Sequence, residues 1–73
     1  MEYAVSFNSD ITNEEQKEFN SLREAVEAYS DLIEEYNSLP FLDHNRVREQ
    51  NGIITLYKIQ KRRANKTLLS WRI

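Results

Sequence analysis

The 73-residue sequence contains no cysteine, one glycine and one proline. Without cysteine the chain has no disulfide framework, no cysteine-ligated zinc or iron–sulfur centre and no thiol nucleophile. A single glycine excludes a glycine-rich phosphate loop and a dinucleotide fingerprint. No apolar run reaches the roughly 18 residues needed to span a bilayer, and no basic-then-apolar leader opens the chain. We therefore expect a soluble, cytoplasmic protein with no membrane partner.

The length of the chain allows one domain, residues 1–73, with one small core. A chain of this size buries only about 60% of its unfolded surface, so its stability is marginal. The composition, 40% hydrophobic and 30% charged, is ordinary for a globular domain. Either an economical core or a partner must complete the fold.

The net charge of −2 conceals a division along the chain. Residues 1–50 hold all 12 acidic residues and 4 of the 10 basic ones, a net charge of −8. Residues 51–73 hold the other 6 basic residues and no acidic one, a net charge of +6. Such asymmetry suggests a charged partner or internal complementarity, whereas the plainer interpretation is a solvated acidic helix and a solvated basic hairpin.

The first half of the chain predicts a strand followed by a helix. Alternating apolar residues over 3–7 are typical of a half-buried strand. Ser21 and Glu24 have the spacing of a capping box, and the helical periodicity that follows predicts a helix over residues 21–37, ended before Pro40. Residues 11–18 are polar and weakly patterned, and the capping spacing of Thr12 allows one or two helical turns there.

The second half of the chain predicts strands. Asn51-Gly52 is typical of a two-residue type I′ hairpin turn, with positive φ at both positions, between strands at 45–50 and 53–60. A polar turn over 61–66 and a final strand over 67–73 follow. The expected fold is α+β, one main helix packed on a small antiparallel-rich sheet in the order β-α-β-β-β. If residues 45–50 form a strand, the first strand pairs parallel at one edge; otherwise the last strand could pair with it.

Catalytic and metal-binding patterns are not found. His44 is the one histidine, and beside Asp43 in an expected loop it is most simply a solvated surface residue. Metal-ligand spacings are missing, and carboxylate pairs catalyse glycoside chemistry only within a cleft that so small a domain hardly forms. We expect no enzyme, no catalytic residue, no metal and no cofactor.

The helix carries an acidic ridge opposite its apolar stripe, which we define as the partner-binding candidate. Like charges four residues apart and acidic residues near the helix C-terminus both destabilise a helix. A sequence that breaks such local preferences without a compensating interaction often does so at a functional surface. The alternative is a solubilising face. The acidic ridge consists of Glu24, Glu27, Asp31, Glu34 and Glu35.

The predicted hairpin is apolar on both faces, although one helix covers only one of them. We expect the second face to be an interface, most simply with a second copy in a homodimer, because one self-complementary patch suffices for two-fold symmetry. The competing account covers this face with residues 9–19 and 38–44, through Ile11, Phe41 and Leu42. The interface candidates are Ile53, Tyr57 and Ile59, flanked by Arg46 and Arg48.

Basic residues cluster around the last predicted turn, near Tyr57 and Trp71. Bases beside exposed aromatics can hold phosphates and stack nucleobases. The net charge of −8 in the rest of the chain opposes this, so nucleic acid is the weaker alternative. The candidate residues are Lys58, Lys61, Arg62, Arg63 and Lys66.

The start Phe19-x-Ser21-x-x-Glu24-Ala25, the Asn51-Gly52 pair and the many Asn, Ile and Glu residues resemble small accessory proteins of phages and mobile elements of low-GC bacteria. The resemblance is one of style and topology and assigns no residue. It implies a host-directed inhibitor or adaptor. The sequence thus favours a non-enzymatic module that binds a protein, and a basic protein is one candidate partner.

Overall fold

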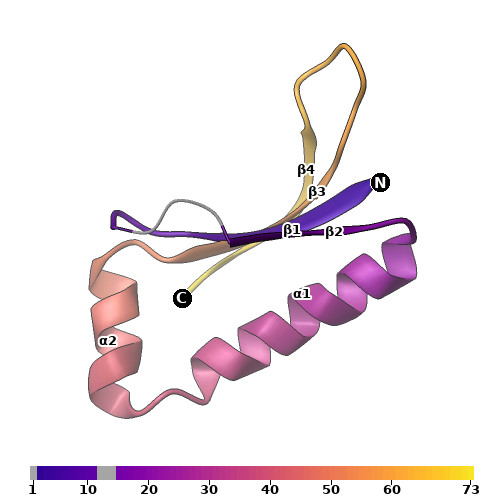
Figure 1. Cartoon of the computed structure of the whole chain (residues 1–73). Helices are drawn as coiled ribbons and strands as arrows, with labels where there is room; N and C mark the ends of the chain where they lie inside the picture. Colours follow the sequence, from indigo (N-terminus) through magenta and orange to yellow (C-terminus); the bar gives the residue numbers. More distant parts are fainter. Residues whose placement is uncertain (1, 12–14) are drawn as a thin grey trace.

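The computed structural model describes residues 2–11 and 15–73, which form four strands and two helices (Figure 1). The fold class α+β is confirmed. In chain order the elements are β1 (Tyr3–Asn8), β2 (Glu15–Phe19), α1 (Leu22–Asn37), α2 (Phe41–Glu49), β3 (Ile53–Lys58) and β4 (Lys66–Arg72).

The strands form one antiparallel sheet in the order β2-β1-β3-β4. Strand β1 lies inside the sheet, where Val5 is opposite Lys17 of β2 and Leu56 of β3. Strands β3 and β4 form a hairpin whose register shifts between Leu56 and Tyr57. Neither expected strand order is observed, because β1 has antiparallel neighbours on both sides and β4 lies at an edge beside β3.

Helix α1 covers one face of the sheet and closes the core (Figure 1). The rings of Phe7 and Tyr36 stack with centroids 4.5 Å apart, which joins β1 to the end of α1. Burying each large apolar side chain contributes about 1.5–3 kcal/mol, so a core this small leaves little reserve. The buried cluster is Val5, Phe7, Ala25, Tyr29, Ile54 and Leu56.

Helix α1 confirms the helix predicted over residues 21–37. The hydroxyl Oγ of Ser21 accepts a hydrogen bond from the backbone N–H of Glu24 at 3.3 Å, as the capping spacing predicts. At the other end the backbone N–H of Ser38 donates to the carbonyl of Glu34 at 3.0 Å. These caps hold the acidic ridge in helical geometry.

The strand predicted over residues 45–50 is wrong, because these residues lie in α2 and at its end. Asn51, at φ 56°, donates its backbone N–H to the carbonyl of Arg48, and Gly52 donates to that of Val47, both at 3.0 Å. This is the Schellman ending of a helix, in which asparagine takes the left-handed position. The Asn-Gly pair therefore ends a helix instead of turning a hairpin, and Gly52 does not have positive φ.

The helical turns considered for residues 11–18 are also wrong where the structure describes them. Residues 15–19 form β2, which pairs with β1 through its backbone. A charged edge strand needs no alternation of apolar residues, so its periodicity gives no strand signal. Thr12, which suggested a capping box, lies outside the described residues.

Candidate functional site

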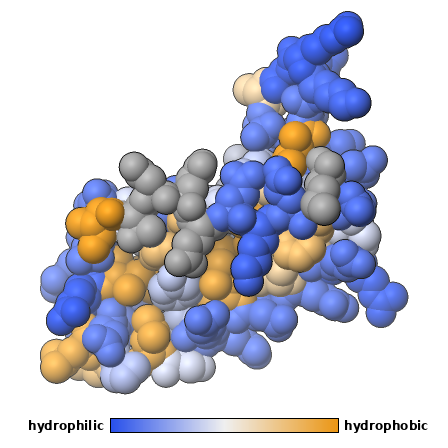
Figure 2. All heavy atoms as spheres, in the orientation of Figure 1, coloured by the Kyte–Doolittle hydropathy of each residue, from blue (hydrophilic) through white to orange (hydrophobic). Residues whose placement is uncertain are grey.

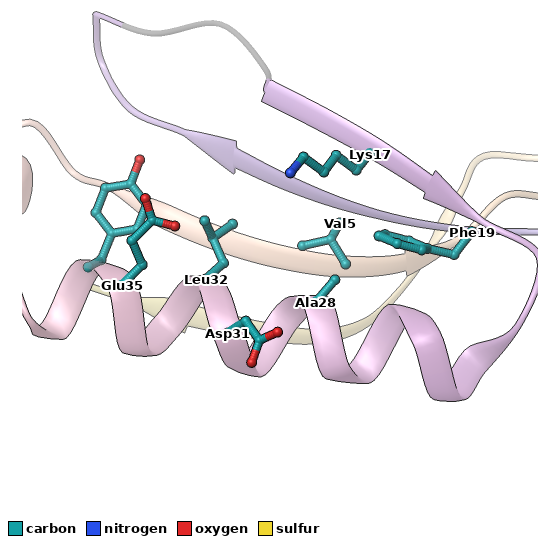
Figure 3. A pocket seen from close by; sticks show the side chains of 8 residues that line it. Val5, Lys17, Phe19, Ala28, Asp31, Leu32 and Glu35 are labelled. Carbon is teal, nitrogen blue, oxygen red and sulfur yellow. The ribbon is translucent and has the colours of Figure 1, made fainter.

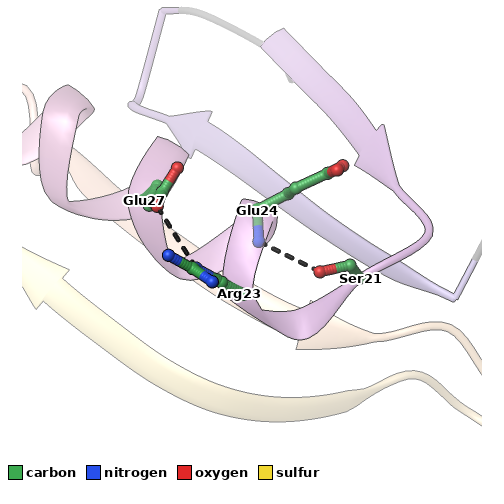
Figure 4. A network of polar contacts seen from close by, with 4 residues as sticks. All are labelled: Ser21, Arg23, Glu24 and Glu27. Carbon is green, nitrogen blue, oxygen red and sulfur yellow. Dashed lines mark hydrogen bonds and ion pairs between the residues drawn. The ribbon is translucent and has the colours of Figure 1, made fainter.

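The acidic ridge of α1 is exposed along its whole length. Its one basic neighbour on the helix, Arg23, lies 3.7 Å from Glu27, from Nε to Oε1 (Figure 4). Both side chains are largely exposed, and water and salt screen such a pair, so it adds little stability. The ridge therefore presents its carboxylates to solvent.

The arrangement of acids on α1 costs stability. Glu27 and Asp31, like Asp31 and Glu35, are neighbours four residues apart, and each like-charged pair costs about 0.2–0.5 kcal/mol. The last turn of α1 contains no basic residue to balance the negative end of the helix dipole. The ridge is thus not explained by helix stability.

A groove of about 400 Å³ lies between α1 and β2, beside the ridge (Figure 3). Val5 of β1, Phe19 of β2 and Leu32 of α1 supply apolar walls. Charged side chains reach it from both elements, and the full lining is Val5, Lys17, Phe19, Ala28, Asp31, Leu32, Glu35 and Tyr36.

The groove combines an apolar interior with a charged rim. Lys17 comes from β2, whereas Asp31 and Glu35 come from α1, so the rim has a net negative charge. An apolar side chain that enters the groove would bring a neighbouring cationic group close to two carboxylates. Sequence reasoning found the two acids but missed Lys17 and Phe19 as partners, since β2 was not expected.

The predicted apolar interface is only partly assembled. Ile53 and Tyr57 lie on the sheet face away from α1, since Ile54 and Leu56 between them face the core, and Ile59 follows β3. All three side chains are half-buried. The prediction that Arg46 and Arg48 flank them on a paired strand is wrong, because both residues belong to α2.

The three side chains named for the alternative cover of this face do not provide it. Phe41 and Leu42 begin α2 with 77% and 76% of their surfaces exposed, and Ile11 is 73% exposed. Side chains so exposed to solvent do not pack over Tyr57. The homodimer itself stays a prediction.

The basic residues Lys58, Lys61, Arg62, Arg63 and Lys66 are all exposed on the β3–β4 hairpin. The hairpin tip extends away from α1 and from the rest of the sheet (Figure 1), and it is hydrophilic (Figure 2). Arg62 adopts φ 65°, which turns the chain within the tip. The sequence therefore correctly indicated a solvent-exposed basic turn at residues 61–66.

His44 and the acidic side chains were the remaining candidates for a catalytic or metal site. His44 is half-buried in α2, and the described part of the chain contains no group of three residues placed to hold a metal. Among those same residues, no helix is long and apolar enough to cross a membrane. No protein-family model, curated protein or solved structure matches this chain. The functional argument therefore proceeds from the surfaces alone.

Proposed function

We propose that this chain is a small, non-enzymatic protein-binding module, an inhibitor or adaptor of the kind that phages and mobile elements encode. Its acidic ridge and the adjoining groove bind a basic, amphipathic segment of another protein. The observation that carries the proposal is the apolar groove bordered by two ridge carboxylates, Asp31 and Glu35.

The proposed contact divides into an anchor and a rim. An aliphatic or aromatic side chain of the partner fills the space between Phe19 and Leu32. Flanking lysine or arginine side chains then pair with Asp31 and Glu35. Buried apolar anchors supply most of the affinity of protein interfaces, and charges at the rim supply orientation and association rate.

The test is a titration of the isotope-labelled protein with two peptides, followed by amide NMR shifts. One peptide alternates leucine with lysine, and the other alternates leucine with glutamate at the same length. The lysine peptide should shift the amides of β2 and of the middle of α1, around Lys17 and Asp31. Equal shifts of these β2 and α1 amides by both peptides, or lysine-peptide shifts confined to other elements, would contradict the proposal.

Two matched variants separate the groove from general acidity. Asp31→Lys with Glu35→Lys should weaken binding of the lysine peptide about tenfold or more, in the range that charge-pair loss produces. Glu27→Lys with Glu34→Lys makes the same change in net charge on ridge residues that do not line the groove, and should weaken it less. Equal loss in both variants would assign binding to net charge and not to the groove.

A second candidate function is nucleic-acid binding by the hairpin tip. It is favoured by the exposure of Lys61, Arg62 and Arg63 on a hairpin that extends from the body (Figure 1). Replacing these three residues by glutamine should weaken binding to a mixed-sequence oligonucleotide and flatten its dependence on salt. If the wild-type chain fails to bind that oligonucleotide at low salt, this function is excluded.

A further inference from the structure

The two edges of the sheet are chemically different. Edge strand β2 has the sequence EQKEF, which is mostly charged, and charged residues on an edge oppose pairing with another strand. Edge strand β4 has the sequence KTLLSWR, with no proline and no acidic residue, and every residue in it is exposed. This edge of seven residues, with three large apolar side chains in its middle, offers unpaired backbone groups that invite the addition of a strand.

Large apolar side chains surround this free edge. Leu69 and Trp71 are opposite Leu56 and Ile54, both core residues, so they lie on the α1 side of the sheet. Nevertheless they remain 48% and 45% exposed, and the neighbouring Leu68 is 37% exposed. Helix α1 packs on β1, β2 and β3, which leaves the α1 side of β4 open.

The same surface continues onto α1. The groove lies on the flank of α1 that faces β2, where Ala28 and Leu32 contact it. At 100° per residue, Leu22 and Val26 lie on the other flank of the buried stripe, toward β3 and β4. Both are exposed. The apolar surface therefore joins the free edge of β4 to the adjacent flank of α1.

The positive charge around β4 favours an acidic partner over a second copy of this chain. Residues 51–73 have a net charge of +6 and contain no acidic residue, and Lys66 and Arg72 stand at the two ends of β4. A second copy paired through β4 would bring two such segments together, with no acid on either strand to offset them. Pairing centred on Leu69 would also set Lys66 opposite Arg72 twice, and like charges directly opposite are destabilising.

We propose that β4 binds an extended, acidic segment of another protein, which adds to the sheet as a fifth strand. Alternate apolar side chains of that segment pack on Leu69 and Trp71, on the α1 side. The side chains between them are acidic and face Arg72 on the opposite side of the sheet. This surface lies on the other flank of α1 from the groove and is independent of the proposed function.

Trp71 is the one tryptophan in the sequence, so its fluorescence reports directly on β4. The probe is an eight-residue peptide that alternates valine with glutamate. Binding should move the Trp71 emission to shorter wavelength and protect the amides of β4 from hydrogen exchange. A peptide with lysine in place of glutamate should bind at least tenfold more weakly. An N-methylated peptide of the same sequence, which lacks the strand hydrogen bonds, should not bind.

Two variants locate the contact. Arg72→Glu should reverse the preference between the glutamate and lysine peptides, and Leu69→Ser should weaken both by about tenfold. Asp31→Lys with Glu35→Lys should leave the glutamate peptide bound as in the wild type, so this proposal and the proposed function fail separately. Circular dichroism establishes that each variant is folded, and Arg72→Lys supplies a variant that keeps the charge.

Four results would overturn the proposal. The first is no binding of the glutamate peptide at millimolar concentration. The second is equal binding of the N-methylated peptide, which would mean that no strand is added. The third is self-association that protects β4 without any peptide, which would assign the edge to a second copy. The fourth is a larger change in Trp71 emission with an oligonucleotide than with the glutamate peptide, which would assign the edge to nucleic acid.

Discussion

Gly52 is the position at which a single methyl group should perturb this fold most informatively. A Cβ atom built on Gly52 would lie 2.7 Å from Cγ1 of Val47 and 3.2 Å from Cε2 of Phe7. Real Cβ atoms essentially never approach another atom within 3.0 Å, so something must move. Val47 is β-branched and stiff at χ1, and Phe7 is part of the buried cluster, so neither yields easily.

The expected cost of Gly52→Ala is that of overpacking a core, about 1–3 kcal/mol. A chain of this length has a free energy of unfolding of roughly 4–11 kcal/mol, at 0.05–0.15 kcal/mol per residue. The substitution should therefore remove a substantial part of the stability. Urea unfolding followed by circular dichroism measures it, with the midpoint moving at constant slope.

A double-mutant cycle with Val47→Ala tests whether the clash with Cγ1 of Val47 causes this loss of stability. Removing Cγ1 of Val47 removes the closest clash, so Gly52→Ala should cost about 1 kcal/mol less in that background. Asn51→Gly is the control for backbone conformation, because φ 56° at residue 51 suits glycine. It removes the hydrogen bond that Nδ2 of Asn51 donates to Oδ2 of Asp10 at 2.9 Å, so it should cost about 0.5–1.5 kcal/mol, equally with and without Val47→Ala.

The result that refutes this reasoning is an equal cost of Gly52→Ala in both backgrounds. Gly52→Asn provides a second check. In the hairpin turn that the sequence suggested, asparagine would tolerate the positive φ better than alanine. In the structure the constraint is space, so asparagine should cost at least as much as alanine, and a milder effect would favour the turn.

Four further predictions concern α1 and assembly. Ser21→Ala should lower the free energy of unfolding by about 0.5–2 kcal/mol through loss of the cap to Glu24, measured by urea titration, whereas Ser21→Asp should retain it. Glu34→Lys should raise that free energy by about 0.3–1 kcal/mol, since it places a cation in the last turn of α1; no gain would show that the dipole is already compensated. Burial raises the pKa of Tyr29 above 10.0, so the stability contributed by its neutral hydroxyl is fully present below pH 10 and is lost as pH rises through the raised pKa. The difference in free energy of unfolding between the wild type and Tyr29→Phe, measured by urea titration, should therefore be constant below pH 10 and fall above the raised pKa. Sedimentation equilibrium should show a wild-type dimer at tens of micromolar that Tyr57→Glu dissociates without unfolding; a wild-type monomer would refute the predicted homodimer.

The sequence predicted elements that carry their own periodicity and caps. Helix α1 has an apolar stripe and an N-cap at Ser21, so local rules suffice to locate it. The basic turn between β3 and β4 was likewise found from its composition. Strand β2 was missed because a charged edge strand owes its conformation to pairing with β1 and not to its own side chains.

The error at residues 45–52 has a different cause. The pair Asn51-Gly52 fits a hairpin turn and a Schellman helix end, since each allows asparagine in the left-handed region. Pro40 occupies the N-cap position of α2, where its missing N–H costs no helical hydrogen bond, and it was the signal that could have decided between them. Choosing the hairpin moved Arg46 and Arg48 onto a strand, and with them the polar rim of the predicted interface.

The division of charge along the chain becomes a division across α1 in the structure. The groove and its carboxylates, Asp31 and Glu35, lie on the β2 side of the helix, whereas β4 and its bases lie beyond the other flank. Unlike charges on opposite flanks do not neutralise each other through direct pairing, so each surface keeps its attraction for a partner of opposite sign. A chain built this way can hold a basic segment and an acidic strand at the same time. The adaptor role then predicts that the leucine–lysine and valine–glutamate peptides, at concentrations at which they do not associate with each other, bind together without competition. Competition under those conditions would reduce the two surfaces to one.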